Sequence, residues 1–140
     1  MGMKRDKFDI AMNNLIRERA GWVCERCGKY YPEGNRGGLE HSHIWGRRRH
    51  SVRWEPDNGM ALCTGCHRHV SANPRDHETL AISVFGEKRC AEVKVQANSV
   101  RRWKPWEKDA LHKKMKSELK RMEAMRADGV TGRIEFNLEI

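Results

Sequence analysis

Four of the five cysteines fall into two Cys-x-x-Cys pairs, Cys24 with Cys27 and Cys63 with Cys66. In such a turn both sulfurs can face one point, and zinc favours four thiolates in a tetrahedron at about 2.3 Å. The two pairs therefore predict one zinc ion that joins two knuckles, rather than another metal or a redox pair. Four protein ligands leave no open coordination position, so this zinc is expected to be structural, and its binding free energy to contribute to folding.

Three further residues near the second pair are suited to hydrolysis of a phosphodiester: His43, Asn58 and His67. That reaction needs a nucleophilic water, a base to deprotonate it and a cation to stabilise the charge on phosphate. Histidine suits the base because its ordinary pKa lies near neutrality, and a second, neutral histidine can hold a metal. An asparagine amide can fix the orientation of an imidazole. Each residue taken alone is more commonly non-catalytic, but the set together with the four cysteines favours catalysis.

A cluster of four arginines lies between the candidate base and the asparagine: Arg47, Arg48, Arg49 and Arg53. Guanidinium forks match phosphate oxygens, and such contacts position a nucleic-acid backbone without reading its sequence. We therefore predict DNA backbone contacts for these arginines, with a salt-bridged surface loop as the alternative. Trp45 and Trp54, beside them, are expected to support a hairpin rather than to stack on bases.

Composition agrees with a nucleic-acid partner. The formal charge is +9 and the isoelectric point about 9.6, which favours polyanions. With 34% charged and 38% hydrophobic residues, a chain of 140 residues is expected to have a small core, which a bound metal can stabilise. An odd number of cysteines with knuckle spacing fits metal binding in a reducing compartment. No apolar run approaches the roughly 18 residues of a membrane span, and no signal peptide is visible, so we expect a cytoplasmic protein without a membrane partner.

The elements that position these residues can be read from periodicity. An amphipathic helix is predicted over residues 1–20, with Asp6 as N-cap and Gly21 as its stop. It is expected to pack over the zinc region, with phosphate contacts as the less favoured role of its basic residues Lys4, Arg5, Lys7 and Arg17. A loop over 32–38, strands over 39–45 and 51–54, and a turn over 55–59 follow, before a short helix that runs from Cys66 to the boundary at 73–74.

The last third of the chain is predicted to be mostly helical. Helices are expected over 76–85, 87–102 and 105–127, the last one opened by Pro105 and ended by Gly129. Cys90, far from the knuckle spacing, is expected to be a buried or half-buried thiol and not a ligand. Residues 133–140 alternate polar and apolar side chains, which is typical of a half-buried strand that needs a sheet edge in this chain or in a neighbour.

A family resemblance brings these motifs together. The chain resembles the four-cysteine HNH endonucleases, in particular small phage and prophage members. The motifs that carry the resemblance are Cys24-x-x-Cys27, Ser42-His43-Ile44, Arg47-Arg48, Arg53-Trp54, Pro56-Asp57-Asn58 and Leu62-Cys63-x-x-Cys66-His67. The match covers about residues 20 to 75 well. It implies an α+β, mostly helical fold with a ββα-metal core, a four-cysteine zinc site, flanking helices and a long C-terminal helix. The corresponding segments are an N-terminal helix over 1–21, a zinc-stapled nuclease core over 22–75 and a helical extension over 76–140, in one compact domain.

The resemblance also implies roles. His43 would be the general base, Asn58 would orient it, and His67 would hold one catalytic divalent cation, Mn²⁺ or Mg²⁺. This chain departs from the family at Ser42, where many members carry a second metal ligand. His41 is the candidate substitute, because strand alternation places it on the same face as His43, and water is the other possibility.

The leading hypothesis is therefore a metal-dependent DNA endonuclease, a monomer or weak homodimer that nicks one strand per active site. Two hypotheses from other classes remain. The first is a zinc-ribbon nucleic-acid-binding module with an inactive site, for which Ser42 is the best argument. The second is a protein-interaction adaptor that docks through its long helix and its alternating tail.

Overall fold

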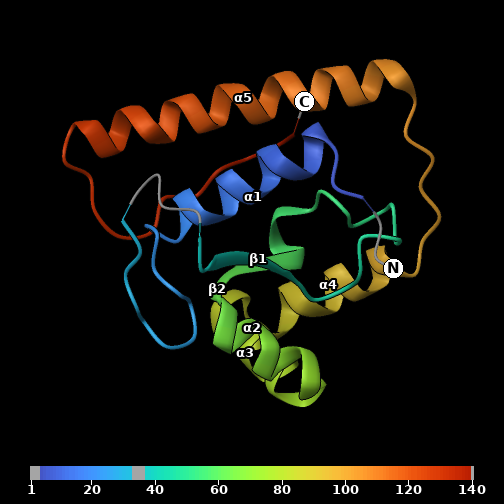
Figure 1. The fold of residues 1–140 in the computed structure, drawn as a ribbon. Helices are drawn as coiled ribbons and strands as arrows, with labels where there is room; N and C mark the ends of the chain where they lie inside the picture. Colours follow the sequence, from blue (N-terminus) through green and yellow to red (C-terminus); the bar gives the residue numbers. More distant parts are fainter. Residues whose placement is uncertain (1–3, 33–36, 140) are drawn as a thin grey trace.

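The computed structural model describes residues 4–32 and 37–139, so residues 1–3 of the predicted first helix and 33–36 of the predicted loop lie outside it. The fold is α+β, with a two-stranded sheet among mostly helical elements (Figure 1). In chain order these are α1 (Lys7–Arg19), β1 (Leu39–His43), η1 (Pro56–Asn58), β2 (Gly59–Cys63), α2 (Thr64–Ala72), α3 (Pro74–Phe85), α4 (Glu87–Ala97) and α5 (Pro105–Ala127). None of the helices within the described ranges is long and apolar enough to cross a bilayer.

The sheet is an antiparallel pair in which Leu39 lies opposite Cys63 and His43 opposite Gly59. The first strand was predicted, but the prediction of a second strand over 51–54 is wrong. Those residues form turns, because Val52 N–H donates to Arg49 O at 3.0 Å and Val52 O accepts from Glu55 N–H at 3.1 Å. The side chain of Val52 is buried in a small cluster with residues of α4, so its apolar character reflects packing and not strand pairing.

Helix α1 lies between the sheet and α5, which crosses above it (Figure 1). Its predicted N-cap is confirmed, since Asp6 Oδ1 accepts from the N–H groups of Phe8 and Asp9 at 3.0 Å each. The predicted apolar faces of the two helices are buried together: Phe8, Met12, Leu15 and Ile16 from α1, and Leu111, Met115 and Met122 from α5. The same cluster includes residues of both strands, α2, α3 and the C-terminal tail, so one core supports the region around the cysteines.

Helix α4 ends at Ala97, five residues before its predicted end at 102. Side chains of the arginine-rich loop donate to the last carbonyls of α4: Ser51 Oγ to Gln96 O at 2.6 Å and Arg49 Nη1 to Ala97 O at 3.2 Å. A side chain that satisfies a terminal carbonyl in this way stabilises the end of a helix.

The alternating tail buries one face, as predicted, but pairs with no strand among the described residues. Ile134, Phe136 and Leu138 are buried against the main core. The tail backbone instead bonds to helices, with Ile134 N–H donating to Arg19 O at 3.1 Å and Asn137 N–H to Glu118 Oε1 at 2.8 Å. The described residues of this chain therefore provide no sheet edge for the tail, and an edge in a neighbouring chain stays a prediction.

The predicted half-buried thiol at Cys90 is confirmed.

Asp9 ties the arginine-rich loop to α1. Its carboxylate accepts from Arg53 Nε at 2.9 Å, from Arg53 Nη2 at 2.6 Å and from Trp54 Nε1 at 3.0 Å, and it forms an ion pair with Arg47 at 3.3 Å. Burial alone would raise the pKa of Asp9, but the hydrogen bonds from Arg53, from the Asp6 backbone and from Trp54 lower it to about 2. The Asp9 carboxylate is therefore ionised in the folded protein at neutral pH.

We expect Asp9→Asn to lower the free energy of unfolding by about 3–5 kcal/mol, because it leaves the buried Arg53 guanidinium with only the more exposed Asp6 carboxylate, at 3.4 Å, as countercharge. The depressed pKa means that the Asp9 contribution is complete above the ordinary value of 3.8 and is lost as pH falls towards about 2. Urea unfolding at pH 7 and pH 3 measures both effects. The matched control is Asp109→Asn on the exposed face of α5, expected within about 0.5 kcal/mol of wild type. Equal stability of Asp9→Asn and wild type at pH 7 would contradict this role.

Candidate functional site

The four cysteines predicted to share a metal come together in the fold. Their Sγ atoms all lie within 4.8 Å of one another, and those of Cys27 and Cys63 are 3.9 Å apart. A tetrahedral ion with bonds of about 2.3 Å needs sulfurs about 3.8 Å apart, so the cluster could hold a metal ion such as zinc with small adjustments.

Local backbone geometry builds this cluster from two turns. In the first, Cys24 N–H donates to Lys29 O and Gly28 N–H donates to Cys24 O, both at 2.9 Å, with Gly28 at a φ of 80° that favours glycine. In the second, Cys63 ends β2 and caps α2, and its sulfur accepts from Cys66 N–H at 3.4 Å. Glu25 joins the first turn to β2. Its backbone N–H donates to Ala61 O at 2.8 Å, and its carboxylate accepts from Ala61 N–H at 2.7 Å.

The two predicted histidines of β1 stack on each other. The rings of His41 and His43 lie 3.9 Å apart between centroids at an interplanar angle of 28°, as strand alternation requires. Asn13 of α1 fixes His41, since its Oδ1 accepts from His41 Nδ1 at 2.9 Å. The Nε2 atom of His41 is buried without a hydrogen-bond partner, and a Cβ added at Gly59 would lie 1.9 Å from it. Only glycine at position 59 therefore leaves room for this ring.

His67 on α2 is paired with a carboxylate that the sequence did not single out. Its Nδ1 donates to Glu40 Oε1 at 2.8 Å, and Thr64 Oγ1 donates to Glu40 Oε2 at 3.4 Å. A carboxylate on Nδ1 places the ring proton there and leaves the Nε2 lone pair available. This is the arrangement that most metal-bound histidines adopt.

His41, His43 and His67 line one cavity of about 500 Å³ beside β1. Three guanidinium groups line it as well, from Arg5, Arg17 and Arg47, together with the carboxylates of Asp9 and Glu40. Within residues 4–32 and 37–139 the four cysteines are the only His, Cys, Asp or Glu set of three or more whose ligand atoms lie close enough to hold a metal. The imidazoles thus share a cavity, but they do not form a ready-made set of three protein ligands.

The two strand histidines are neutral at pH 7. Burial, with the positive charges of neighbouring groups, lowers the pKa of His41 well below its ordinary value. Burial and then the nearby Arg47 lower the pKa of His43 to about 4. A neutral imidazole keeps a lone pair that can accept a proton or bind a cation.

The side chain of Asn58 does not contact the histidine rings and bonds instead to the backbone of Trp45 and Val52. Its Oδ1 accepts from Trp45 N–H at 2.9 Å, and its Nδ2 donates to Trp45 O at 2.8 Å and to Val52 O at 3.0 Å. The side chain is buried and bonded to backbone, in contrast to the expected amide contact with His43. It closes the loop that follows the two strand histidines, and its carbonyl accepts from Ile44 N–H at 2.8 Å, so any influence on His43 passes through the backbone.

The four arginines of the cluster have different surroundings. The guanidinium of Arg53 is buried against Asp9, which agrees with the salt-bridged alternative and leaves it little surface for a phosphate. Arg47 lines the cavity, and Arg48 is exposed. Arg49 is exposed and bonds to Ala97 O and Asn98 Oδ1 at the end of α4.

Sequence reasoning missed Asn13, which holds His41, and Asp9, which holds the arginine-rich loop. Asp9, Asn13 and Arg17 follow one another at intervals of four along α1, so they form a polar stripe beside its apolar face. All three line the cavity, and this spacing was a signal that could have found them. Glu40 carried only a weaker signal, as the residue directly before His41. Ser42 bonds to a residue that no motif marked, with its Oγ 3.2 Å from His77 Nε2.

Comparison with known proteins gives no relative for this chain: no protein-family model, no curated protein and no solved structure matches it.

Proposed function

We propose that this protein is a metal-dependent DNA endonuclease that hydrolyses phosphodiester bonds and nicks one strand per active site. In this proposal β1, β2 and α2 form the ββα-metal core that the resemblance to HNH endonucleases implies. The observation that carries it is the single cavity in which His43, the His67–Glu40 pair and three guanidiniums meet. Hydrolysis of a phosphodiester needs these groups together: a base, a site for a cation and positive charge for phosphate.

His67 would hold the catalytic cation, Mn²⁺ or Mg²⁺, through Nε2, with Glu40 fixing the orientation of the ring. The cation would stabilise the charge that develops on the phosphate. His41 would be the second ligand only after its ring moves, because its unpaired Nε2 is buried against Gly59. Phosphate oxygens and water would complete the coordination, as these hard cations prefer.

His43 would accept the proton of the attacking water, which its neutral ring allows at pH 7. Asn58 would act as a positioning residue, because it bonds to the backbone of Trp45, two residues after the base. Arg5, Arg17 and Arg47 would bind the phosphate from the cavity wall, and the exposed Arg48 would contact the backbone nearby.

The four thiolates would bind a structural zinc. Sulfur ligands select zinc over Mg²⁺ or Mn²⁺, and four of them leave no position open for substrate. The zinc would hold the first knuckle against Cys63, at the junction of β2 and α2, and against Cys66, one residue before His67.

Nicking of supercoiled plasmid with Mn²⁺ or Mg²⁺ tests the proposal. Loss of a general base typically costs about 10²–10⁴-fold, so we expect a loss of this size for His43→Ala, with DNA binding retained. The control is His69→Ala, two residues beyond His67 on the same helix but bonded to Asp76 and outside the cavity. Full nicking by His43→Ala, or no metal-stimulated nicking by wild type, would exclude the proposed chemistry.

A nucleic-acid-binding module without catalysis is the second candidate. It is favoured by the lack of a third preformed ligand in the described residues and by Ser42, whose hydroxyl bonds to His77. This alternative predicts binding that weakens with salt according to the number of phosphate contacts, and no metal-stimulated nicking. The plasmid assay therefore separates the two functions.

A further inference from the structure

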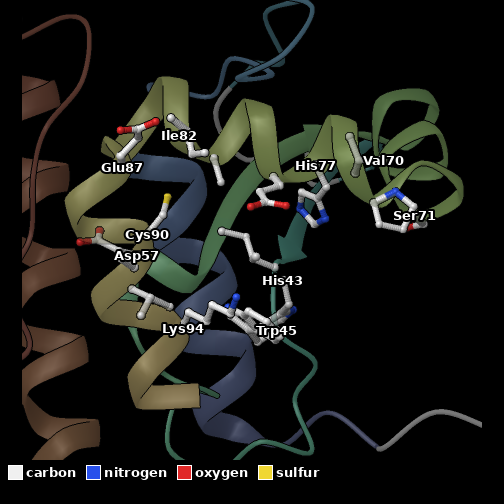
Figure 2. A pocket seen from close by; sticks show the side chains of 16 residues that line it. His43, Trp45, Asp57, Val70, Ser71, His77, Ile82, Glu87, Cys90 and Lys94 are labelled. Carbon is white, nitrogen blue, oxygen red and sulfur yellow. The ribbon is translucent and has the colours of Figure 1, made fainter. Parts of the chain in front are cut away.

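A second and larger cavity, of about 740 Å³, adjoins His43 on the other side (Figure 2). Cys90 and Lys94 project into the region from α4, Val70 and Ser71 lie across from them on α2, and His77 comes from α3. The volume lies within the range of about 300–1,000 Å³ that small-molecule sites occupy.

The walls of this cavity combine apolar surface with a few polar groups. Ile44, Trp45, Val70, Ala81 and Val93 supply apolar atoms. Hydrogen-bonding groups come from Asp57, Ser71, His77, Glu78, Glu87 and Lys94. A site that combines apolar surface with hydrogen-bonding groups is suited to a flat heteroaromatic ligand whose edge forms hydrogen bonds, and a nucleobase is such a ligand.

His43 lines both cavities, and the two have contrasting chemistry. On one side Arg5, Arg17 and Arg47 offer positive charge for an anion. On the other side the surface is partly apolar and includes the ring of Trp45. A nucleotide has the same two ends, an anionic phosphate and an aromatic base joined by a sugar.

We propose that the larger cavity binds the base of an unpaired nucleotide next to the cleaved phosphate, so that the preferred substrate is DNA with an unpaired nucleotide. This inference rests on the proposed nuclease function and names its substrate class. A base inside a protein cavity has left its partner and its stack, which costs free energy in a perfect duplex and little at a bulge or in a single strand. Glu78 can accept a hydrogen bond from an exocyclic amino group, as carboxylates do from cytosine N4.

The test compares two duplexes of the same sequence, one perfect and one with a single bulged nucleotide. Stacking and burial of one base support a preference of about tenfold or more for the bulged duplex. Ala91 is exposed on α4 and lines the cavity, so Ala91→Trp fills it without disturbing the core. We expect this variant to bring the ratio of nicking rates close to one. Val95→Trp, at a position that is 70% exposed on the same helix and outside the cavity, should keep the wild-type ratio.

Binding provides a readout that does not need cleavage. Fluorescence anisotropy of His43→Ala with the two labelled duplexes should show the same preference, and Ala91→Trp in that background should remove it. Equal affinity and equal nicking of both duplexes by wild type would overturn the inference while leaving the nuclease proposal intact. Absence of nicking from every substrate would overturn the nuclease proposal, and the binding preference would still decide whether the cavity takes a base.

Discussion

Removal of zinc from the four cysteines is expected to unfold the region around both knuckles and to end the cooperative thermal transition of the native protein. Structural zinc supplies about 10–16 kcal/mol of apparent binding free energy in small zinc domains, and whole domains have about 5–15 kcal/mol of stability. The first knuckle is joined to β2 through Glu25, and β2 leads into α2, so loss of the ion would disturb the strand and helix that position His67. Thermal melting by circular dichroism with and without a strong chelator measures the effect.

Cysteine variants sharpen this test. Cys66→Ser removes one ligand, and we expect it to lose stoichiometric zinc and the cooperative transition together. Cys90→Ser is the matched control, since this thiol is half-buried on α4 and outside the cluster. It should keep one zinc per chain and lie within about 1 kcal/mol of wild type. An unchanged melting curve after complete removal of metal would show that the thiol cluster does not support the fold.

The second large effect is expected at His67, where substitution by alanine should reduce nicking to the level of the metal-free protein. Among the described residues that line the cavity, His67 is the histidine whose Nδ1 bonds to a carboxylate, and this bond orients its Nε2. Glu40→Gln should have a graded effect, because loss of such a partner typically costs about 10–100-fold in metal affinity or activity. Titration of nicking rate against Mn²⁺ should therefore show a higher half-saturating concentration for Glu40→Gln.

A second histidine–carboxylate pair on the surface supplies the control. His69 Nε2 and Asp76 Oδ2 are 2.6 Å apart, in a pair that lies outside the cavity. We expect His69→Ala and Asp76→Asn to leave the Mn²⁺ titration unchanged. A wild-type titration for His67→Ala would remove this residue from the metal site, whatever the activity of the other variants.

Local chemistry made most of the helices predictable. The Asp6 cap and the opening proline at Pro105 mark helix boundaries through backbone hydrogen bonding and φ, which act over a few residues. The knuckles were predictable for the same reason, since Cys-x-x-Cys spacing brings two sulfurs to one point. The second strand was not, because Gly59–Cys63 is apolar nearly throughout and buried on both faces, so it lacks the alternation that marks a half-buried strand.

The histidines of the candidate site were predictable from the sequence, but the residues that bond to them were not. His43 and His67 line one cavity, and His41 lies on the face expected from alternation. Their partners are distant in sequence: Asn13 is 28 residues from His41, and Glu40 is 27 from His67. Arg53 shows the same limit, because its buried ion pair with Asp9 depends on how α1 packs against the loop. Such contacts follow from tertiary packing, which spacing along the chain does not encode.

The location of a second metal ion tests the central claim most directly. Crystals of the zinc-loaded protein soaked in Mn²⁺ would show its position by anomalous scattering. We predict one zinc among the four sulfurs and one manganese bonded to His67 Nε2, in the cavity that His43 lines, with the manganese absent from His67→Ala. A zinc peak alone, or manganese bound only away from His67 in the wild-type protein, would contradict the claim that these imidazoles form a catalytic metal site.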